Sequence, residues 1–242
     1  VSYGEESYPF SYETFMQNDS LFLKLIPASK NLKLSYQFTH GIRTNAITYT
    51  KPFLIEKNKS VHVQAFKNDK PYFCVIEFPM AYHKALGSNV TYQSDYNKWY
   101  TAGGNQALVD GKLGSYDFRD GNWQGFWGND AEIIVDLKPN QETTEITINF
   151  YQYNNSWIFI PKEVHVDYTI DGKTWERFGS ALSEADPKKR GKFIETISIK
   201  NIGKVLNLKS IRVSVKNQGI VPDWHEAAGA DAWIFMDEIQ IH

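Results

Sequence analysis

The stretches TEITINF (144–150), VHVDYTI (164–170) and IRVSVKN (211–217) alternate apolar and polar residues with a period of two. Successive side chains of a β-strand point to opposite faces, so this period predicts strands with one buried face. The same signal recurs outward along the chain, and no segment keeps a helical apolar period for long. We therefore predict an all-β protein. Further strands are expected at residues 21–26, 32–38, 60–66, 73–78, 131–137, 193–200 and 232–241.

A break in this pattern divides the chain. The segment PMAYHKALGS (79–88) carries Pro, Gly and Ser without a clear period, so we place a domain boundary there. The strand spacing before it predicts a small β-sandwich at residues 19–82, and the second domain spans 83–242. Turns are expected at His40-Gly41, Asn68-Asp69-Lys70-Pro71 and the hairpin signal Asp171-Gly172, and short helical turns within 11–18 and 180–190.

Charge and length restrict the function. The 242 residues include 26 Lys plus Arg and 28 Asp plus Glu, a formal net charge of -2. A nucleic-acid binder needs a basic surface to neutralise phosphates, so we predict no nucleic-acid partner. No run of 18 apolar residues occurs, so no membrane span is predicted. The polar, acidic start, VSYGEESYPF, shows no signal peptide, and we interpret the chain as a mature or excised fragment.

Catalytic signatures are missing from the sequence. Asp237-Glu238 lies inside the expected last strand, where neighbouring side chains point to opposite faces and cannot flank one glycosidic bond without a bulge. His225-Glu226 begins a zinc-protease pattern that lacks its second histidine. Cys74 is the single cysteine, which makes no internal disulfide, and we expect it to be a buried core thiol. We predict a non-catalytic protein.

Two stretches resemble known families. ITYTKPFLIEKNKSVHVQAFKNDKP (47–71) resembles the small sandwich that follows the barrel in chitobiases and β-N-acetylhexosaminidases. HKALGSNVTYQSDYNKWYTAGGNQALVDGKLGSYDFRDGNWQGFWGNDAEIIVDL (83–137) resembles the opening of a discoidin, or coagulation factor five/eight type C, domain, in the version attached to family 20 glycoside hydrolases of Bacteroides-like bacteria. NSWIFIP (155–161), SIRVSVKNQG (210–219) and DAWIFMDEIQIH (231–242) continue the likeness.

This resemblance implies a discoidin-like (galactose-binding-domain-like) eight-stranded jelly roll after the small sandwich, and residues 1–18 as a tail after a missing catalytic domain. Many such domains are family 32 carbohydrate-binding modules. The chain would then be the accessory region of a secreted, periplasmic or cell-surface β-N-acetylhexosaminidase. Its implied partners are a terminal sugar of a glycan, bound weakly, and the parent catalytic domain.

The resemblance also implies a structural Ca²⁺ ion near the ends of the second domain. Calcium takes about 6–8 oxygen ligands. The implied ligands are the Asp110 carboxylate, the Ser115 hydroxyl, backbone carbonyls near Ala107 and Lys112, and Glu238 from the last strand. The residues alone favour the alternative that Asp110-Gly111 is a simple turn and Glu238 a surface charge, and it is the resemblance that favours the metal.

Sugar binding needs an aromatic ring and a few polar groups on loops of a rigid scaffold. Loops at 95–104, 119–128 and 217–226 offer this combination, and 151–157 is a fourth candidate. Their candidate ligand-binding residues are Trp99, Tyr100, Arg119, Trp127, Trp224 and His225. Trp123, Trp157, Trp175 and Trp233 are expected to serve packing instead. The identity of the sugar stays open.

The sequence leaves three functions to be tested. The leading one is a carbohydrate-binding accessory region, which holds a parent enzyme near its glycan. The second is a purely structural or protein-docking module that binds no sugar. The third is an enzyme with an unrecognised site.

Overall fold

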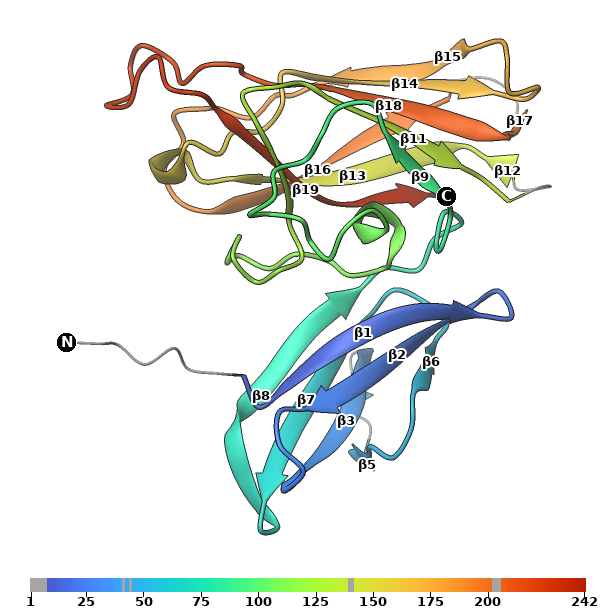
Figure 1. The fold of residues 1–242 in the computed structure, drawn as a ribbon, viewed down its shortest axis with the longest axis vertical. Coiled ribbons are helices and arrows are strands. Elements are labelled where there is room, and N and C mark those ends of the chain that lie inside the picture. The colour runs from blue at the N-terminus through green and yellow to red at the C-terminus, as the bar shows by residue number, and fades with distance from the viewer. Residues whose placement is uncertain (1–7, 41, 44, 139–141, 202–205) are drawn as a thin grey trace. The chain divides into compact units, whose positions relative to one another are not determined.

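The computed structural model describes all residues except 1–7, 41, 44, 139–141 and 202–205 (Figure 1). The chain divides into two compact units, Val1–Tyr82 and His83–His242. The described residues form strands and two short 3-10 turns, and no α-helix occurs among them, so the prediction of an all-β protein is confirmed. In the same residues, no helix is long and apolar enough to cross a membrane.

The first unit is a small sandwich of two antiparallel sheets. One sheet has the order β1-β2-β6, and the other has the order β4-β3-β7-β8, with β5 beside β3. Leu23, Ile55 and Val61 are buried among its core residues. The strands are β1 (Phe10–Gln17), β2 (Ser20–Pro27), β3 (Leu32–His40), β4 (Ile42–Arg43), β5 (Ile47–Thr48), β6 (Phe53–Ile55), β7 (Lys59–Lys67) and β8 (Lys70–Met80).

Two tight hairpins in this unit require residues that tolerate positive φ values. Asn18 and Asp19 have φ values of 50° and 57°, and Asn68 and Asp69 have 51° and 58°. The two-residue turn that best matches the twist of a β-hairpin needs two successive residues with positive φ. Asn and Asp tolerate this conformation. The expected turn at Asn68-Asp69 is therefore confirmed. Of the other expected turn, His40-Gly41, Gly41 lies outside the described residues.

The structure corrects three expectations about the first unit and its borders. Residues 10–17, expected to belong to a tail and to allow a helical turn, form strand β1 and pair along their length with β2. Cys74 is exposed rather than buried. Cys74 is exposed because β8 is an edge strand whose register with β7 shifts between Val63 and Ala65. This irregularity turns the part of β8 that contains Cys74 away from the core.

The second unit packs two larger antiparallel sheets face to face. Their orders are β10-β19-β13-β16 and β15-β14-β18-β11-β9, and β12 and β17 form a separate pair. Among the described residues the two main sheets therefore contain nine strands, where the resemblance implies eight. Its strands are β9 (Val90–Tyr92), β10 (Gln124–Trp127), β11 (Ala131–Asp136), β12 (Glu142–Thr143), β13 (Glu145–Gln152), β14 (Glu163–Thr169), β15 (Glu176–Leu182), β16 (Phe193–Lys200), β17 (Leu206–Asn207), β18 (Ser210–Lys216) and β19 (Trp233–Ile241), with 3-10 turns η1 (Ala107–Val109) and η2 (Asn154–Ser156).

Alternating residues of these sheets supply the core of the second unit. Ile146 and Ile148 of β13 face Val164 and Val166 of β14 within one cluster of buried side chains, as the period of two predicted. The segment 180–190, for which a helical turn is expected from the sequence, is instead the end of β15 and a loop. The jelly-roll-like sandwich therefore has one packed core between its sheets, and the loops extend from the ends of the strands.

The predicted hairpin at Asp171-Gly172 joins β14 to β15 and depends on the Asp171 carboxylate. Backbone N–H groups of Thr174 and Lys173 donate to Asp171 Oδ1 at 2.8 and 2.7 Å. These bonds, that of Thr174 first, lower the pKa of Asp171 to about 2. A carboxyl group whose folded pKa is lowered adds stability above its unfolded pKa of about 3.9, and the contribution disappears as the pH falls through the folded pKa.

We therefore expect Asp171→Asn to lower the melting temperature slightly at pH 7, and the difference from the wild type to vanish as the pH falls from about 4 to about 2. Paired thermal melts across this range measure it. A difference that stays constant from pH 7 to pH 2 would show that the charge of Asp171 contributes nothing.

Candidate functional site

A groove of about 780 Å³ opens at one end of the second unit. Three loops that are far apart in the sequence line it: the η2 turn, the loop before β16 and the loop before β19. Figure 1 shows these loops, coloured from yellow-green to red, at the same end of the two sheets. The lining residues are Tyr153, Asn154, Asn155, Lys188, Arg190, Gly191, Trp224, His225 and Glu226.

Asn154 joins the three loops. Its side-chain amide donates to Pro187 O and Lys189 O, both at 3.3 Å, which holds the loop before β16. Its backbone carbonyl accepts from Trp157 N at 2.8 Å, and His225 Nε2 lies 3.0 Å from it. Asn154 is buried and these bonds are partly buried, so they hold the three loops in position relative to one another.

The His225 side chain holds two loops of the groove together and has no free hydrogen-bond donor for a ligand. Its Nδ1 accepts from Ala227 N at 3.0 Å, so the ring proton is on Nε2, which donates to Asn154 O. Both ring nitrogens are thereby occupied within the protein. The sequence hypothesis gave His225 a direct contact with sugar, and the structure places it between two loops of the groove.

Trp224 supplies the exposed aromatic surface of the groove. The residue is 41% exposed, and its ring meets the buried Phe159 edge-on at 6.3 Å between centroids. The loop that carries it is closed by paired backbone bonds, Val221 N to Ala230 O at 2.7 Å and Gly229 N to Val221 O at 3.0 Å. The ring is therefore held at its base and open at its outer part, as a platform for the apolar face of a sugar must be.

The other predicted binding residues do not line this groove. Trp99 is 68% exposed on the loop 95–104, with Lys98 Nζ 5.5 Å from its ring centroid. Tyr100 packs against Phe235 at 4.7 Å and belongs to a small aromatic cluster of the core. Arg119 Nε donates to Asp117 Oδ1 at 3.0 Å. Each of these residues has a local contact that accounts for its position.

The remaining tryptophans divide between exposed and buried positions. Trp127, a candidate binder, is 41% exposed but stacks on Trp233 at 5.5 Å with an interplanar angle of 10°. Trp123 is fully buried, as expected for a fold residue. Trp157, expected inside, is 37% exposed, because its left-handed φ of 62° ends η2 and turns the chain outward.

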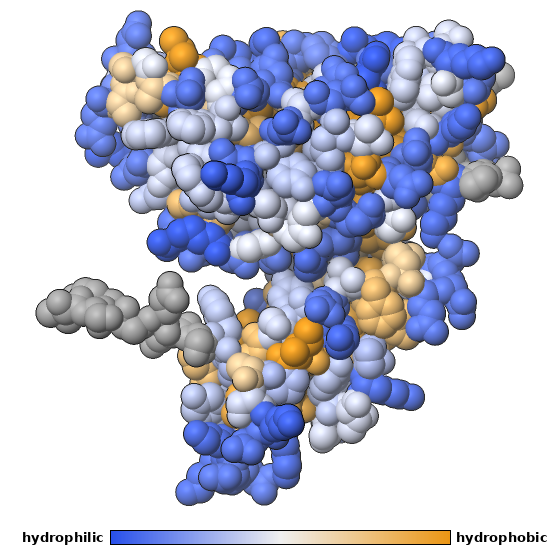
Figure 2. Space-filling model, viewed as in Figure 1, coloured by the Kyte–Doolittle hydropathy of each residue, from blue (hydrophilic) through white to orange (hydrophobic). Residues whose placement is uncertain are grey.

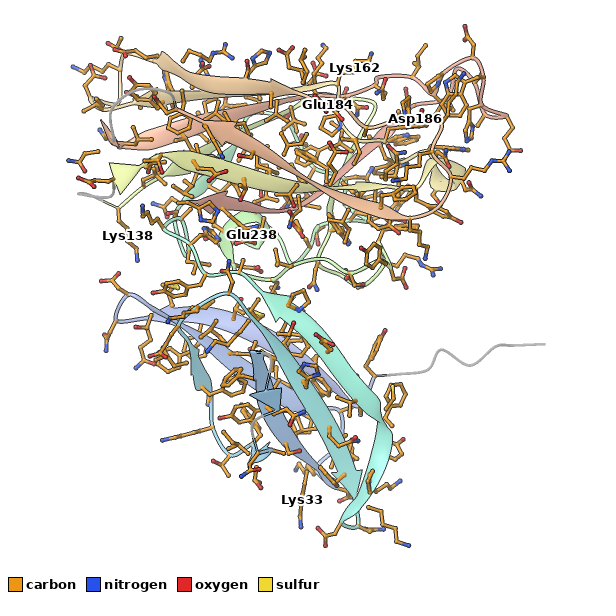
Figure 3. The ribbon with its side chains drawn as sticks, turned by 180° about the vertical axis from the view of Figure 1, so that it is seen from behind. Lys33, Lys138, Lys162, Glu184, Asp186 and Glu238 are labelled. Atoms are coloured by element: carbon orange, nitrogen blue, oxygen red, sulfur yellow. The ribbon has the colours of Figure 1, made fainter. Side chains whose placement is uncertain are left out.

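The basic loop 186–191 is the part of the groove that sequence reasoning missed. Its run DPKKRG has no alternation, and together with the residues before it the run allows a helical turn. The available signal was the Asp-Pro start, which favours a turn. In the structure Asp186 Oδ1 accepts from Lys188 N at 2.9 Å, and this bond shapes the loop. Figure 3 labels Asp186 at this end of the unit.

A second feature is a buried cluster of carboxylates in β19 and the loop after η1. Between Ile148 and Phe150 of β13 the register with β19 shifts, so a β-bulge places Asp237 and Glu238 opposite a single residue. Gly114 N donates to Asp237 Oδ2 at 2.9 Å, and Gly111 N donates to Glu238 Oε1 at 2.8 Å. The expectation that the two side chains point to opposite faces is therefore wrong, because it assumed an unbroken strand.

The predicted calcium ligands meet this cluster in part. Asp110 is near Glu238, and Asp110 Oδ2 lies 2.7 Å from the ammonium Nζ of Lys112, the residue expected to offer its carbonyl. Glu238 Oε1 also accepts from His83 Nε2 at 2.7 Å. Ala107 is buried in η1, whereas Ser115 is exposed and its hydroxyl oxygen accepts from Asp117 N at 3.1 Å. Glu238, labelled in Figure 3, is away from the groove loop of Asp186.

Burial dominates the electrostatics of this cluster. It raises the pKa of Asp237 to about 7, against the bonds from Gly114 N and Asn149, and it lowers the pKa of His83 to about 3. Burial and then the charge of Asp110 raise the pKa of Glu238, and burial also raises that of Asp110 despite Lys112. The Lys112 ammonium pairs with Asp110 and also acts on Glu238, so the three carboxylates would carry two uncompensated negative charges if all of them were ionised.

One observation indicates that the carboxylate cluster could hold a divalent cation. Asp237 Oδ1 and Glu238 Oε2 are buried without a hydrogen-bond partner. In the described part of the chain, no three His, Cys, Asp or Glu side chains are grouped so that they alone could hold a metal ion. A calcium ion here would therefore also need backbone carbonyls or a hydroxyl, which are ligands that calcium accepts.

The second unit is thus a jelly-roll-type β-sandwich with a groove among its end loops. No protein-family model matches the chain, and no curated protein matches it. Among solved structures it is similar to CBM32-1 from a family 31 glycoside hydrolase from Clostridium perfringens, with 15% identity, 64% of this chain and 94% of that chain covered, and a TM-score of 0.39.

Two further solved structures give the same picture. The module CpGH89CBM32-5 from Clostridium perfringens, in complex with GalNAc-β-1,3-galactose, shows 11% identity, covers 64% of this chain and 94% of its own, and has a TM-score of 0.39. The C-terminal domain of a chitobiase from Bacteroides fragilis shows 14% identity, 64% and 93% coverage, and a TM-score of 0.38. These likenesses are distant, and nothing about the ligand of the groove follows from them.

Proposed function

We propose that the second unit is a non-catalytic carbohydrate-binding module that holds a terminal sugar in the groove beside Trp224. The observation that carries this is an exposed tryptophan face in a preformed groove of about 780 Å³, bordered by the polar side chains of Asn155 and Glu226. Ligand sites have volumes of about 300–1,000 Å³ and combine apolar faces with a few fixed polar groups. We also propose, on the sequence resemblance, that the chain serves a parent β-N-acetylhexosaminidase that is secreted, periplasmic or at the cell surface.

The chemistry of the groove favours binding over hydrolysis. Glycosidases of the usual kind place two carboxyl groups on either side of the scissile bond. Glu226 is the one carboxylate that lines this groove in the described part of the chain, and Asp237 and Glu238 are buried in the core, out of reach of a glycan. On the face drawn in Figure 2, hydrophilic residues cover most of the second unit and apolar ones form small separate patches, which gives little support to apolar docking there.

We expect Trp224→Ala to weaken sugar binding about tenfold or more, the change that about 1.4 kcal/mol represents, because the apolar platform is lost. Trp99→Ala is the matched control, since Trp99 is the more exposed ring but lies outside the groove. A glycan array with terminal N-acetylglucosamine, N-acetylgalactosamine and galactose, followed by titration of the bound sugar, makes the comparison. Silence of the array, or equal loss in the two variants, would refute the proposal.

We further propose that the buried carboxylate cluster holds a structural Ca²⁺ ion. Asp110 and Glu238 would hold it, together with carbonyl or hydroxyl oxygens of residues 107–115. The two unpartnered buried oxygens of Asp237 and Glu238 support the proposal. The ion would supply the missing positive charge and join the loop after η1 to the last strand.

A further inference from the structure

We propose that the groove selects a sugar that carries an anionic group, a carboxylate or a sulfate. This inference rests on the proposed function and names the chemical class of its ligand. It is carried by two groove-lining cations that form no ion pair among the described residues, Lys188 and Arg190, and that the protein holds beside the aromatic platform.

The charges that line the groove are mostly positive. Lys188 and Arg190 come from the loop before β16, and Glu226 is the single opposing carboxylate among the described lining residues. Lys192 lies nearby, with its Nζ 5.6 Å from the ring centroid of the lining residue Tyr153, but its charge also acts on the Asp117 carboxylate. His225 adds no charge in its bonded form, because its Nδ1 accepts a backbone N–H. A neutral sugar would make no use of this excess of positive charge.

Two of these cations, Lys188 and Arg190, have no acidic partner among the residues that the structure describes, whereas Lys192 interacts with the Asp117 carboxylate. In this part of the chain, the ion pairs include none made by Lys188 or Arg190. The nearest acid in sequence, Asp186, uses its Oδ1 for the backbone of Lys188. An incoming anion would therefore pair with Lys188 and Arg190 without first displacing an internal carboxylate.

Two buried side chains form hydrogen bonds that hold the backbone of this basic loop in place. Gln152 and Asn154 are only 2% and 4% exposed. The Gln152 amide donates to Asp186 O at 2.9 Å, and the Asn154 amide donates to Pro187 O and Lys189 O at 3.3 Å. A solvated charge run needs no such anchoring. The loop instead has a fixed backbone that keeps its cations beside the groove.

The position of Lys188 links the charge to the platform. Its Nζ lies 5.8 Å from the ring centroid of Trp224. A sugar stacked at Trp224 would therefore present a substituent to the ammonium of Lys188, and Arg190 offers a planar fork suited to a carboxylate or sulfate. Because these groups are exposed, the gain is modest: we expect about tenfold tighter binding of the anionic sugar at low salt.

The test uses two pairs of sugars that differ only in the anionic group: galactose against galacturonic acid, and N-acetylglucosamine against its 6-sulfate. Calorimetric titration of the full chain in about 0.05 M and about 1 M salt should show a preference for the acid that salt removes. The double variant Lys188→Gln/Arg190→Gln should lose the preference and keep its melting temperature. Lys98→Gln is the matched control, because Lys98 lies beside exposed Trp99 as Lys188 lies beside Trp224.

The outcomes separate the two proposals. Preference for either acid, lost in the double variant and kept in Lys98→Gln, supports the inference, and the pair that shows it tells carboxylate from sulfate. Equal binding of neutral and acidic sugars overturns the inference while the proposed function stands. So does a preference that survives in the double variant. Failure of all four sugars to bind overturns the proposed function and this inference with it.

Discussion

Replacement of Gly114 with alanine is expected to destabilise the second unit by about 3 kcal/mol, at the upper end of what overpacking a core costs. A Cβ at this position would lie 2.1 Å from Trp123 Cε2 and 2.3 Å from Trp123 Nε1. Trp123 has no room to retreat, because it is fully buried and its Nε1 donates to Ser115 O at 2.9 Å. Moving Gly114 instead would break its bond to Asp237. Urea denaturation measures the loss.

Gly121→Ala is the control for this substitution. Gly121 has a φ of +87° and open space around it, so an alanine there adds only backbone strain, about 1–2 kcal/mol. Trp123→Leu supplies a second check, because a smaller side chain makes room for the new methyl group. We expect the double variant Gly114→Ala/Trp123→Leu to be more stable than the sum of the two single losses predicts. Strict additivity, or a loss in Gly114→Ala no greater than in Gly121→Ala, would argue against the steric explanation.

Regular alternation was the most reliable guide to the fold, and its failures have local causes. The period of two placed β13, β14 and β18, because each has one face in the core. It gave the wrong orientation for Asp237 and Glu238, since a bulge inserts one extra residue and leaves no mark on the apolar pattern. It missed β1, which forms a tight hairpin with β2 where a tail was expected.

The groove could be predicted only in part. Trp224 and His225 were candidates because aromatic and polar residues share a turn-rich loop. Their proximity to Asn154 and Lys188 depends on sheet pairings between distant segments, which local sequence does not contain. Exposure was equally hard to predict: Trp127 and Trp224 are both 41% exposed, yet one stacks on Trp233 and the other borders the groove. A lone tryptophan in a loop looks the same in the sequence in either case.

Calcium is expected to have the second large effect. At 1,000 times its dissociation constant, an ion that binds only the folded state adds about 4 kcal/mol to the free energy of unfolding. The physical reason is that burial disfavours the ionised forms of Asp110, Asp237 and Glu238, and a bound cation would stabilise these forms where only Asp110 is paired with an ammonium, that of Lys112. Thermal melts with about 1 mM calcium and with excess chelator measure the effect, and we expect the chelator to lower the melting temperature of the second unit.

Variants distinguish a bound ion from a site that Lys112 already neutralises. Asp110→Asn should abolish the calcium-dependent shift, whereas Asp117→Asn, an exposed carboxylate of the same loop paired with Arg119, should leave it unchanged. Lys112→Met removes the competing ammonium, so it should destabilise the chelated protein and enlarge the gain from calcium. If the melts with calcium and with chelator coincide in both the wild type and Lys112→Met, the cluster holds no ion. Its buried carboxylates would then be kept in part by protonation, as the raised pKa of Asp237 allows.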